Sequence, residues 1–121
     1  MATENQKSKK IGFIIAALFI VAALIASIIY ISGSSERSLK KQLSLGNKYL
    51  NEADYDNAKA VFKEAIKIDP KCVDAYLGLI EAYESSGEDD LALKVAKRGL
   101  ETTKDKRLQK SVEKIEDKAL I

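Results

Sequence analysis

The residues that usually carry chemistry are scarce in this chain of 121 residues. It has no histidine, so the commonest general base and the commonest transition-metal ligand are missing. Its single cysteine, Cys72, can form neither an intramolecular disulfide nor a multi-cysteine metal site, and we interpret it as a small, partly buried residue. No Gly-rich phosphate loop occurs. We therefore predict that the protein is not an enzyme and binds no cofactor and no metal.

Charge is distributed unevenly along the chain. The formal net charge is +2, and the first ten residues account for it, with three lysines against one glutamate. From residue 32 onward, 17 basic residues face 17 acidic ones. Carboxylates and lysines alternate there as on a solvated helical surface. A neutral surface of mixed sign argues against nucleic-acid binding, which needs a net basic face.

The segment 11–31 is almost wholly apolar and is broken only by one glycine, one serine and Tyr30. As a helix it would span about 31 Å, which matches the ~30 Å hydrocarbon core of a bilayer. We expect a transmembrane helix here, after a short basic tail at residues 1–10. A cleavable signal peptide is the alternative, but its apolar core is normally about 7–15 residues long.

The flanking charges bear on the orientation of this anchor. Three lysines lie directly before the apolar run, which favours a cytoplasmic N-terminus, although Arg37, Lys40 and Lys41 follow the run. We expect a single-pass protein of the plasma membrane with its soluble part outside the cytoplasm. Small residues four apart within the run, such as Gly12 and Ala16, could support helix pairing and hence a homo-oligomer.

The rest of the chain shows the periodicity of helices. Residues 32–38 read Ser-Gly-Ser-Ser-Glu-Arg-Ser and predict a short flexible linker that ends the membrane helix. Five helices are then expected, at about 39–51, 54–68, 73–84, from 88 onward, and at 105–119. Asp54 is the expected N-cap of the second, and Pro70 and Gly87 follow the ends of the second and third.

The segment that begins at Leu39 aligns without gaps with the segment that begins at Val73, which places Leu45 opposite Leu79, Tyr49 opposite Tyr83 and Ala58 opposite Ala92. The first unit resembles the tetratricopeptide repeat family through residues at the family's spacings: Leu45, Gly46, Tyr49, Ala58, Phe62, Ala65 and Pro70. The second unit is degenerate, because Ile80, Ala96, Gly99 and Lys104 depart from that pattern. We suggest that the larger Ile80 offsets the smaller Ala96 in volume.

The resemblance implies an all-α fold: an N-terminal transmembrane helix followed by a two-repeat α-solenoid of antiparallel helix pairs. The repeats would occupy residues 39–72 and 73–106, and residues 107–121 would form the capping helix that terminal repeats need. In the first repeat, Gly46 and Ala58 would let the paired helices approach closely. Tyr49 and Phe62 would fill the space between them.

Proteins of this family usually bind a peptide or a partner helix in a groove lined by the first helix of each pair. By position, the resemblance places eight residues there: Lys40, Leu43, Asn47, Leu50, Asp74, Leu77, Glu81 and Glu84. The alternative is that the leucines partly serve the core and the charges are merely solvated. A clamp for chaperone tails is not expected, because Leu43 and Gly78 stand where that specialisation has Lys and Asn.

We therefore expect a membrane-anchored adaptor or scaffold that binds protein partners, with a role beside a secretion or envelope complex. A cytosol-facing docking receptor for targeting peptides is one alternative. A self-assembling structural membrane protein is the other. Binding of unrelated client proteins would favour the adaptor, selective binding of targeting peptides the receptor, and oligomers without other partners the structural role.

Overall fold

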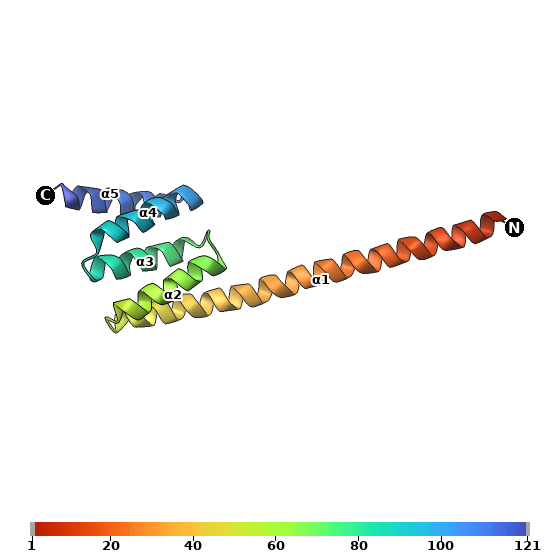
Figure 1. Ribbon diagram of the computed structural model, residues 1–121, viewed down its shortest axis with the longest axis horizontal. Coiled ribbons are helices and arrows are strands. Elements are labelled where there is room, and N and C mark those ends of the chain that lie inside the picture. Colours follow the sequence, from red (N-terminus) through yellow and green to blue (C-terminus); the bar gives the residue numbers. More distant parts are fainter. Residues whose placement is uncertain (1, 121) are drawn as a thin grey trace. The chain divides into compact units, whose positions relative to one another are not determined.

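The computed structural model describes residues 2–120, and five helices make up almost all of this part of the chain (Figure 1). The helices are α1 (Ala2–Asn51), α2 (Tyr55–Ile68), α3 (Val73–Ser85), α4 (Asp89–Thr103) and α5 (Lys106–Ala119). Their bounds lie close to the predicted ones, except at the start of α1. The all-α prediction is confirmed.

The chain divides into two compact units, and the division falls within α1 between Glu36 and Arg37. In the first unit the large apolar side chains from Ile11 to Tyr30 are exposed along the helix. From Gln6 onward, α1 is long and apolar enough to cross a membrane, judged by its length and composition. This unit buries no core of its own among the described residues.

Residues 32–38, expected as a flexible linker, are instead helical and belong to α1. The predicted break of the helix at this point is therefore wrong. Serine and glycine lower helix propensity by up to about 1 kcal/mol each, but this segment has no proline, so every backbone N–H can still donate to the turn before it. The division between the two units nevertheless falls inside this segment.

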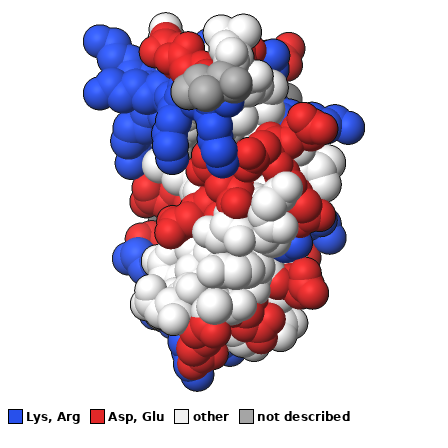
Figure 2. Space-filling model, turned by 90° about the vertical axis from the view of Figure 1, so that its left-hand side faces the viewer, with Lys and Arg blue, Asp and Glu red and all other residues white. Residues whose placement is uncertain are grey.

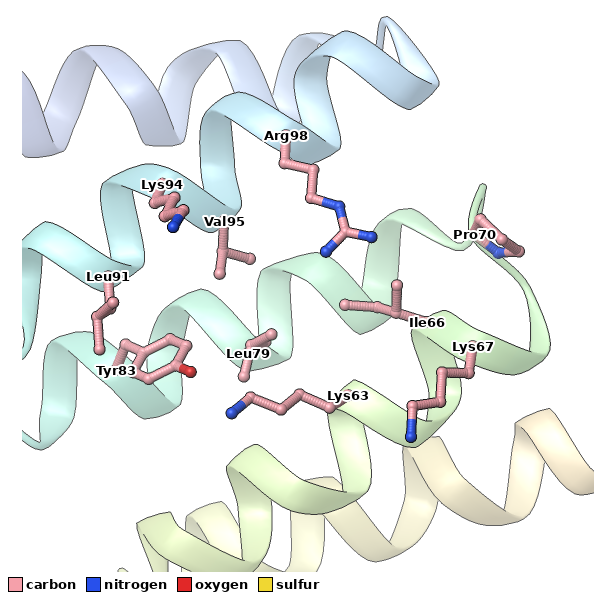
Figure 3. Close-up of a pocket in the computed structure, with 10 residues that line it drawn as sticks. All are labelled: Lys63, Ile66, Lys67, Pro70, Leu79, Tyr83, Leu91, Lys94, Val95 and Arg98. Atoms are coloured by element: carbon pink, nitrogen blue, oxygen red, sulfur yellow. The ribbon is translucent and has the colours of Figure 1, made fainter.

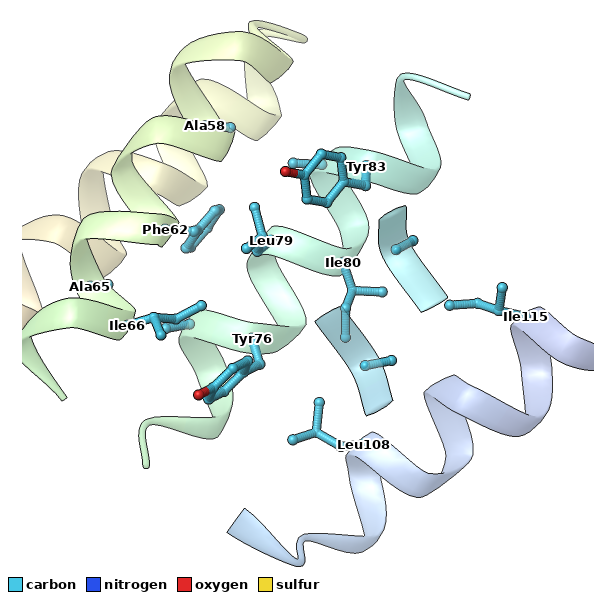
Figure 4. Packing of buried hydrophobic residues seen from close by; sticks show 14 residues of the cluster. Ala58, Phe62, Ala65, Ile66, Tyr76, Leu79, Ile80, Tyr83, Leu108 and Ile115 are labelled. Carbon is cyan, nitrogen blue, oxygen red and sulfur yellow. The ribbon is translucent and has the colours of Figure 1, made fainter. Parts of the chain in front are cut away.

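The second unit comprises the end of α1 from Arg37 and helices α2 to α5, and each helix lies beside the next along the chain (Figure 1). Fourteen buried apolar residues form its core (Figure 4). They come from α2, α3, α4 and α5, and half-buried residues of α1, among them Leu39, Leu43, Tyr49 and Leu50, pack against them. The core is thus continuous through the repeats and the final helix.

Phe62 of α2 is the central packing residue of the first repeat. Its side chain is 1% exposed, and two helices approach its ring at glycines. A methyl group at Gly46 of α1 would lie 2.6 Å from Phe62 Cζ, and one at Gly78 of α3 would come closer still to the ring. Only glycine leaves room for the ring at both places. The expected roles of Gly46 and Phe62 are confirmed, whereas the part played by Gly78 was not anticipated.

In the second repeat the large ring lies on the first helix of the pair and the glycine on the second, which is the reverse of the first repeat. The large ring is Tyr76 of α3, and the glycine is Gly99 of α4, where a Cβ would lie 2.8 Å from Tyr76 Cγ and 3.0 Å from Leu108 Cδ1. The Tyr76 hydroxyl donates a 2.8 Å hydrogen bond to the Pro70 carbonyl, so the ring also fastens the turn between the repeats. Gly99, which departs from the family pattern, therefore leaves room for the Tyr76 ring and for Leu108.

The turns inside the two helix pairs have the same hydrogen bonds at equivalent positions of the repeats. The N–H of Asp54 donates to the Tyr49 carbonyl at 2.9 Å, and the N–H of Glu88 donates to the Tyr83 carbonyl at 2.8 Å. Each turn contains one residue in the left-handed region, Ala53 with φ 57° and Gly87 with φ 80°. This pattern closes a helix by the Schellman arrangement, which normally takes glycine at the left-handed position.

Replacing Ala53 by glycine is expected to raise the free energy of unfolding by about 0.5–1 kcal/mol. A left-handed conformation costs an L residue about 1–2 kcal/mol, and the greater freedom of glycine in the unfolded chain returns part of this gain. Urea unfolding of the full chain in nanodiscs measures the change. The matched control is Ala60→Gly at an exposed position inside α2, which should lower stability by a similar amount. Loss of stability in both variants would contradict the account.

Helix α5 covers the end of the solenoid. Leu108 and Ile115, two turns apart on its inner face, are buried, and Leu108 is 0% exposed. Ion pairs surround this contact: Lys97 Nζ lies 2.9 Å from Glu116 Oε1, and Lys118 Nζ lies 2.9 Å from Asp89 Oδ2. The outer face of α5 is charged and solvated, as a terminal capping helix requires.

Candidate partner-binding groove

A hollow of about 250 Å³ lies between α1 and α3 in the second unit, with α2 behind it. Its lining includes five of the eight residues predicted for the binding groove: Leu43, Asn47, Asp74, Leu77 and Glu81. Phe62 and Gly78 complete the lining. The first helices of the two repeats thus bring together side chains that lie far apart in sequence. We call this hollow the α1–α3 groove.

At the base of the hollow, glycine allows the Phe62 ring to pack directly against α3. The ring fills the space where a Cβ of Gly78 would lie, and it is buried directly beneath the groove lining at 1% exposure. Leu43 and Leu77 are half-buried and pack against the core cluster from either side. The leucines therefore serve the core and also present apolar surface to the groove.

The polar residues of the groove differ in whether another side chain already engages them. Asp74 accepts a 3.1 Å hydrogen bond from Arg107 Nη1 of α5. Asp105, hydrogen-bonded to the same guanidinium, raises the pKa of Arg107, and Asp74 adds to this effect. Glu81 is exposed and makes no ion pair with the side chains that the structure describes, those of residues 6–30 and 32–120. The amide of Asn47 is exposed as well. Glu81 and Asn47 are therefore the groups most available to a ligand.

Three predicted groove residues lie outside this hollow. Lys40 is exposed on α1, one turn before Leu43, and Leu50 is half-buried against the core cluster. Glu84 is half-buried at the end of α3 and lies 3.6 Å from Lys114 Nζ of α5. Position in the repeat predicted which helix each residue occupies. Ion pairs with α5 determine which acidic side chains are already engaged and which are available to a ligand.

Phe62 and Gly78 are the lining residues that the sequence did not assign to the groove. Phe62 was recognisable as a filler between helices, and Gly78 only as a departure from the pattern of the chaperone-tail clamp. A glycine on the first helix of one repeat that faces a large aromatic residue on the second helix of the preceding repeat is the signal that could have identified both lining residues. It becomes readable only when the two helices are known to be neighbours.

The groove lining combines apolar, amide and carboxylate side chains. Within residues 2–120 no group of three His, Cys, Asp or Glu side chains is arranged to hold a metal ion. Cys72 is half-buried at the N-terminus of α3 and packs against the core. Figure 2 shows one face of the molecule, on which acidic and basic side chains gather in separate areas beside uncharged surface. Such a surface suits selective contact with other polypeptides.

A family model described as tetratricopeptide repeat matches residues 49–115, which is more than half of the chain. The match runs from the end of α1 to the middle of α5 and includes both helix pairs in part or in full. No curated protein matches the chain.

Proposed function

This chain belongs to the tetratricopeptide repeat family, and on that premise we propose that it docks a peptide or a partner helix in the α1–α3 groove while residues 11–31 hold it in a membrane. Repeats of this family are protein–protein interaction modules that are typically not catalytic. The chain therefore acts as an adaptor or scaffold, and any chemistry belongs to its partners. A place beside a secretion or envelope complex is part of the proposal.

The lining of the α1–α3 groove is the observation that carries this function. Leu43 and Leu77 offer apolar contact, and the exposed amide of Asn47 can both donate to and accept from the backbone of an extended peptide. Glu81 supplies a carboxylate without an ion pair within the described residues. This combination favours a segment with apolar residues and a lysine or arginine that reaches Glu81.

Reversing the charge at Glu81 tests the groove directly. Short peptides are selected from a displayed library against the full chain in nanodiscs and then titrated with purified variants. Glu81→Lys is expected to weaken their binding by about tenfold or more, because attraction to a basic residue becomes repulsion. The matched control is Glu101→Lys, an equal change at an exposed residue of α4.

The control should leave the affinity within about twofold of wild type, because residue 101 lies outside the groove lining. Equal weakening by the two substitutions would show a general effect of net charge and would remove the α1–α3 groove as the binding site. Oligomers that grow with concentration, in a chain that selects no peptide, would favour the self-assembling structural role.

The membrane anchor is supported by the first unit of the chain. Its large apolar side chains are exposed, with Phe13 and Tyr30 each 80% exposed, and such a surface is stable only against lipid or another apolar partner. Tyr30 near the end of the run suits the headgroup region. We propose a single-pass plasma-membrane protein with a cytoplasmic N-terminus and the repeat outside.

Protease accessibility in intact cells tests this orientation. Trypsin added outside should digest the repeat without lysis, because Lys71 and Lys104 are exposed in the turns between helices. Digestion would support the cytoplasmic N-terminus that the lysines before the anchor favour. Protection until the cells are lysed, with the repeat still in the membrane fraction, would overturn the orientation and support a cytosol-facing docking receptor.

A further inference from the structure

A second, larger groove lies between α2 and α4, above α3 (Figure 3). Its volume is about 500 Å³, which is within the range of specific ligand sites. It shares no lining residue with the α1–α3 groove. The second helices of the two repeats form its walls, so it is separate from the surface to which the proposed function is assigned. We call it the α2–α4 groove.

The floor of the α2–α4 groove is apolar. Ile66, Leu79 and Tyr83 are buried core residues whose outer edges line it, and Val95 adds to them from α4. Leu91 stands at one end and is 41% exposed. Among the described residues from 37 onward, Leu91 and Leu120 are the only large apolar side chains classed as exposed. An exposed leucine continuous with an apolar floor marks surface that a partner can cover.

Both walls of the groove carry cations, spaced one helical turn apart. Lys63 and Lys67 lie on α2, and Lys94 and Arg98 lie on α4 (Figure 3). No carboxylate is among the residues that line the groove. The lining therefore carries positive charge only, whereas acidic and basic residues are nearly equal in number from residue 32 onward.

Among the described side chains, those of residues 6–30 and 32–120, neither Lys94 nor Arg98 of α4 makes an ion pair. On the opposite wall, Lys67 Nζ lies 3.3 Å from Glu64 Oε2, and Lys63 Nζ lies 5.6 Å from the centre of the Tyr83 ring. All four head groups stay near water while their stems border the apolar floor, as is common for long cationic side chains. Anions that approach along the groove therefore meet positive charge on both sides.

We propose that the α2–α4 groove docks an acidic amphipathic segment of a partner protein. An occupant that fits has apolar side chains along one face and carboxylates on both flanks of that face. An amphipathic helix presents side chains in this arrangement, and helix-in-groove binding is a recurrent mode of recognition. A flat anionic membrane would touch the cationic walls but would leave the concave floor empty. The shape of the groove therefore favours a polypeptide.

The probe is a fluorescein-labelled helical peptide of about four turns, with leucines at helical spacing and glutamates on both flanks of the leucine face. Its control has lysines in place of the glutamates. The full chain is held in nanodiscs of uncharged phosphatidylcholine, and binding is followed by fluorescence anisotropy. The acidic peptide is expected to bind and the basic one not. The affinity should fall as the salt concentration rises, because exposed charges are screened.

The decisive variant is Lys94→Glu with Arg98→Glu, which should weaken binding of the acidic peptide at least about tenfold. The matched control is Lys106→Glu with Lys110→Glu on α5, which has the same spacing and the same change of net charge. It should alter the affinity about twofold at most. All four positions are exposed, so far-UV circular dichroism should show unchanged helix content.

Leu91→Asn provides a second variant that leaves the cations and the net charge in place and should weaken binding of the acidic peptide through loss of apolar contact. Equal loss of binding in the two charge-reversed pairs would overturn the proposal, because net charge alone would explain it. Failure of the wild-type chain to bind the acidic peptide would overturn it too. So would capture of phosphatidylserine vesicles that depends on Lys94 and Arg98 while the peptide binds independently of them, which would assign these cations to a membrane.

Discussion

Replacing Phe62 by alanine is expected to lower the free energy of unfolding of the repeat by about 3–5 kcal/mol, the usual cost of removing a buried aromatic ring. The ring is 1% exposed and is held between α1 and α3 at two glycines. Because neither glycine has a side chain that could move into the vacated space, little of the cavity can be filled. For a core as small as this one, the loss is a large part of the total stability.

Urea unfolding of the full chain in nanodiscs, followed by circular dichroism, measures this loss. Leu91→Ala is the matched control, since it removes a large apolar side chain that is 41% exposed, and it should cost less than about 1 kcal/mol. If the two substitutions lower the free energy of unfolding by the same amount, Phe62 is not the central packing residue of the first repeat.

Two lysines in the middle of the apolar run are expected to release the chain from the membrane. Val21→Lys and Leu24→Lys lie near the centre of residues 11–31, and each lysine at the centre of a membrane helix costs about 2.5–3.5 kcal/mol. Together they remove about 5–7 kcal/mol of insertion free energy. After extraction of membranes with alkaline carbonate, the variant should be found in the soluble fraction and the wild type in the pellet.

The control for this experiment is Ser35→Lys with Ser38→Lys, which adds the same charge at the same spacing after the apolar run. It should remain in the pellet, because lysines outside the hydrocarbon core reach water. Wild-type chain that is extracted by carbonate would contradict the anchor. So would a Val21→Lys and Leu24→Lys variant that stays in the pellet like the control.

The helices of the repeat could be predicted closely from the sequence because their ends carry local signals. Asp54 caps α2 by accepting from the Asn57 N–H at 3.3 Å, and Asp69 and Pro70 follow its last turn. Capping and proline effects act over one or two turns, so they can be read without knowledge of the fold. The repeat seen in the sequence likewise survives in the matching turns around Ala53 and Gly87.

Two kinds of feature were not predicted from the sequence. One is a helix that continues through residues of low helix propensity, and the other is contact between helices that are distant in the sequence. The composition of residues 32–38 suggested a linker, but they continue α1 because no residue there prevents helical hydrogen bonding. The groove prediction placed residues on the correct helices, yet Glu84 is engaged by Lys114 of the final helix. The α2–α4 groove was not predicted because its cations lie on two helices that α3 separates in the sequence.

Crosslinking from Asn47 shows whether the α1–α3 groove receives the partner. A photoreactive side chain replaces Asn47, which is exposed at the groove, or Lys110 on the outside of α5 as control, in the full chain in nanodiscs. With a library-selected peptide bound, the account predicts crosslinks from position 47 and none from position 110. Crosslinks from position 110, or none from position 47 to a peptide that binds with undiminished affinity, would contradict it.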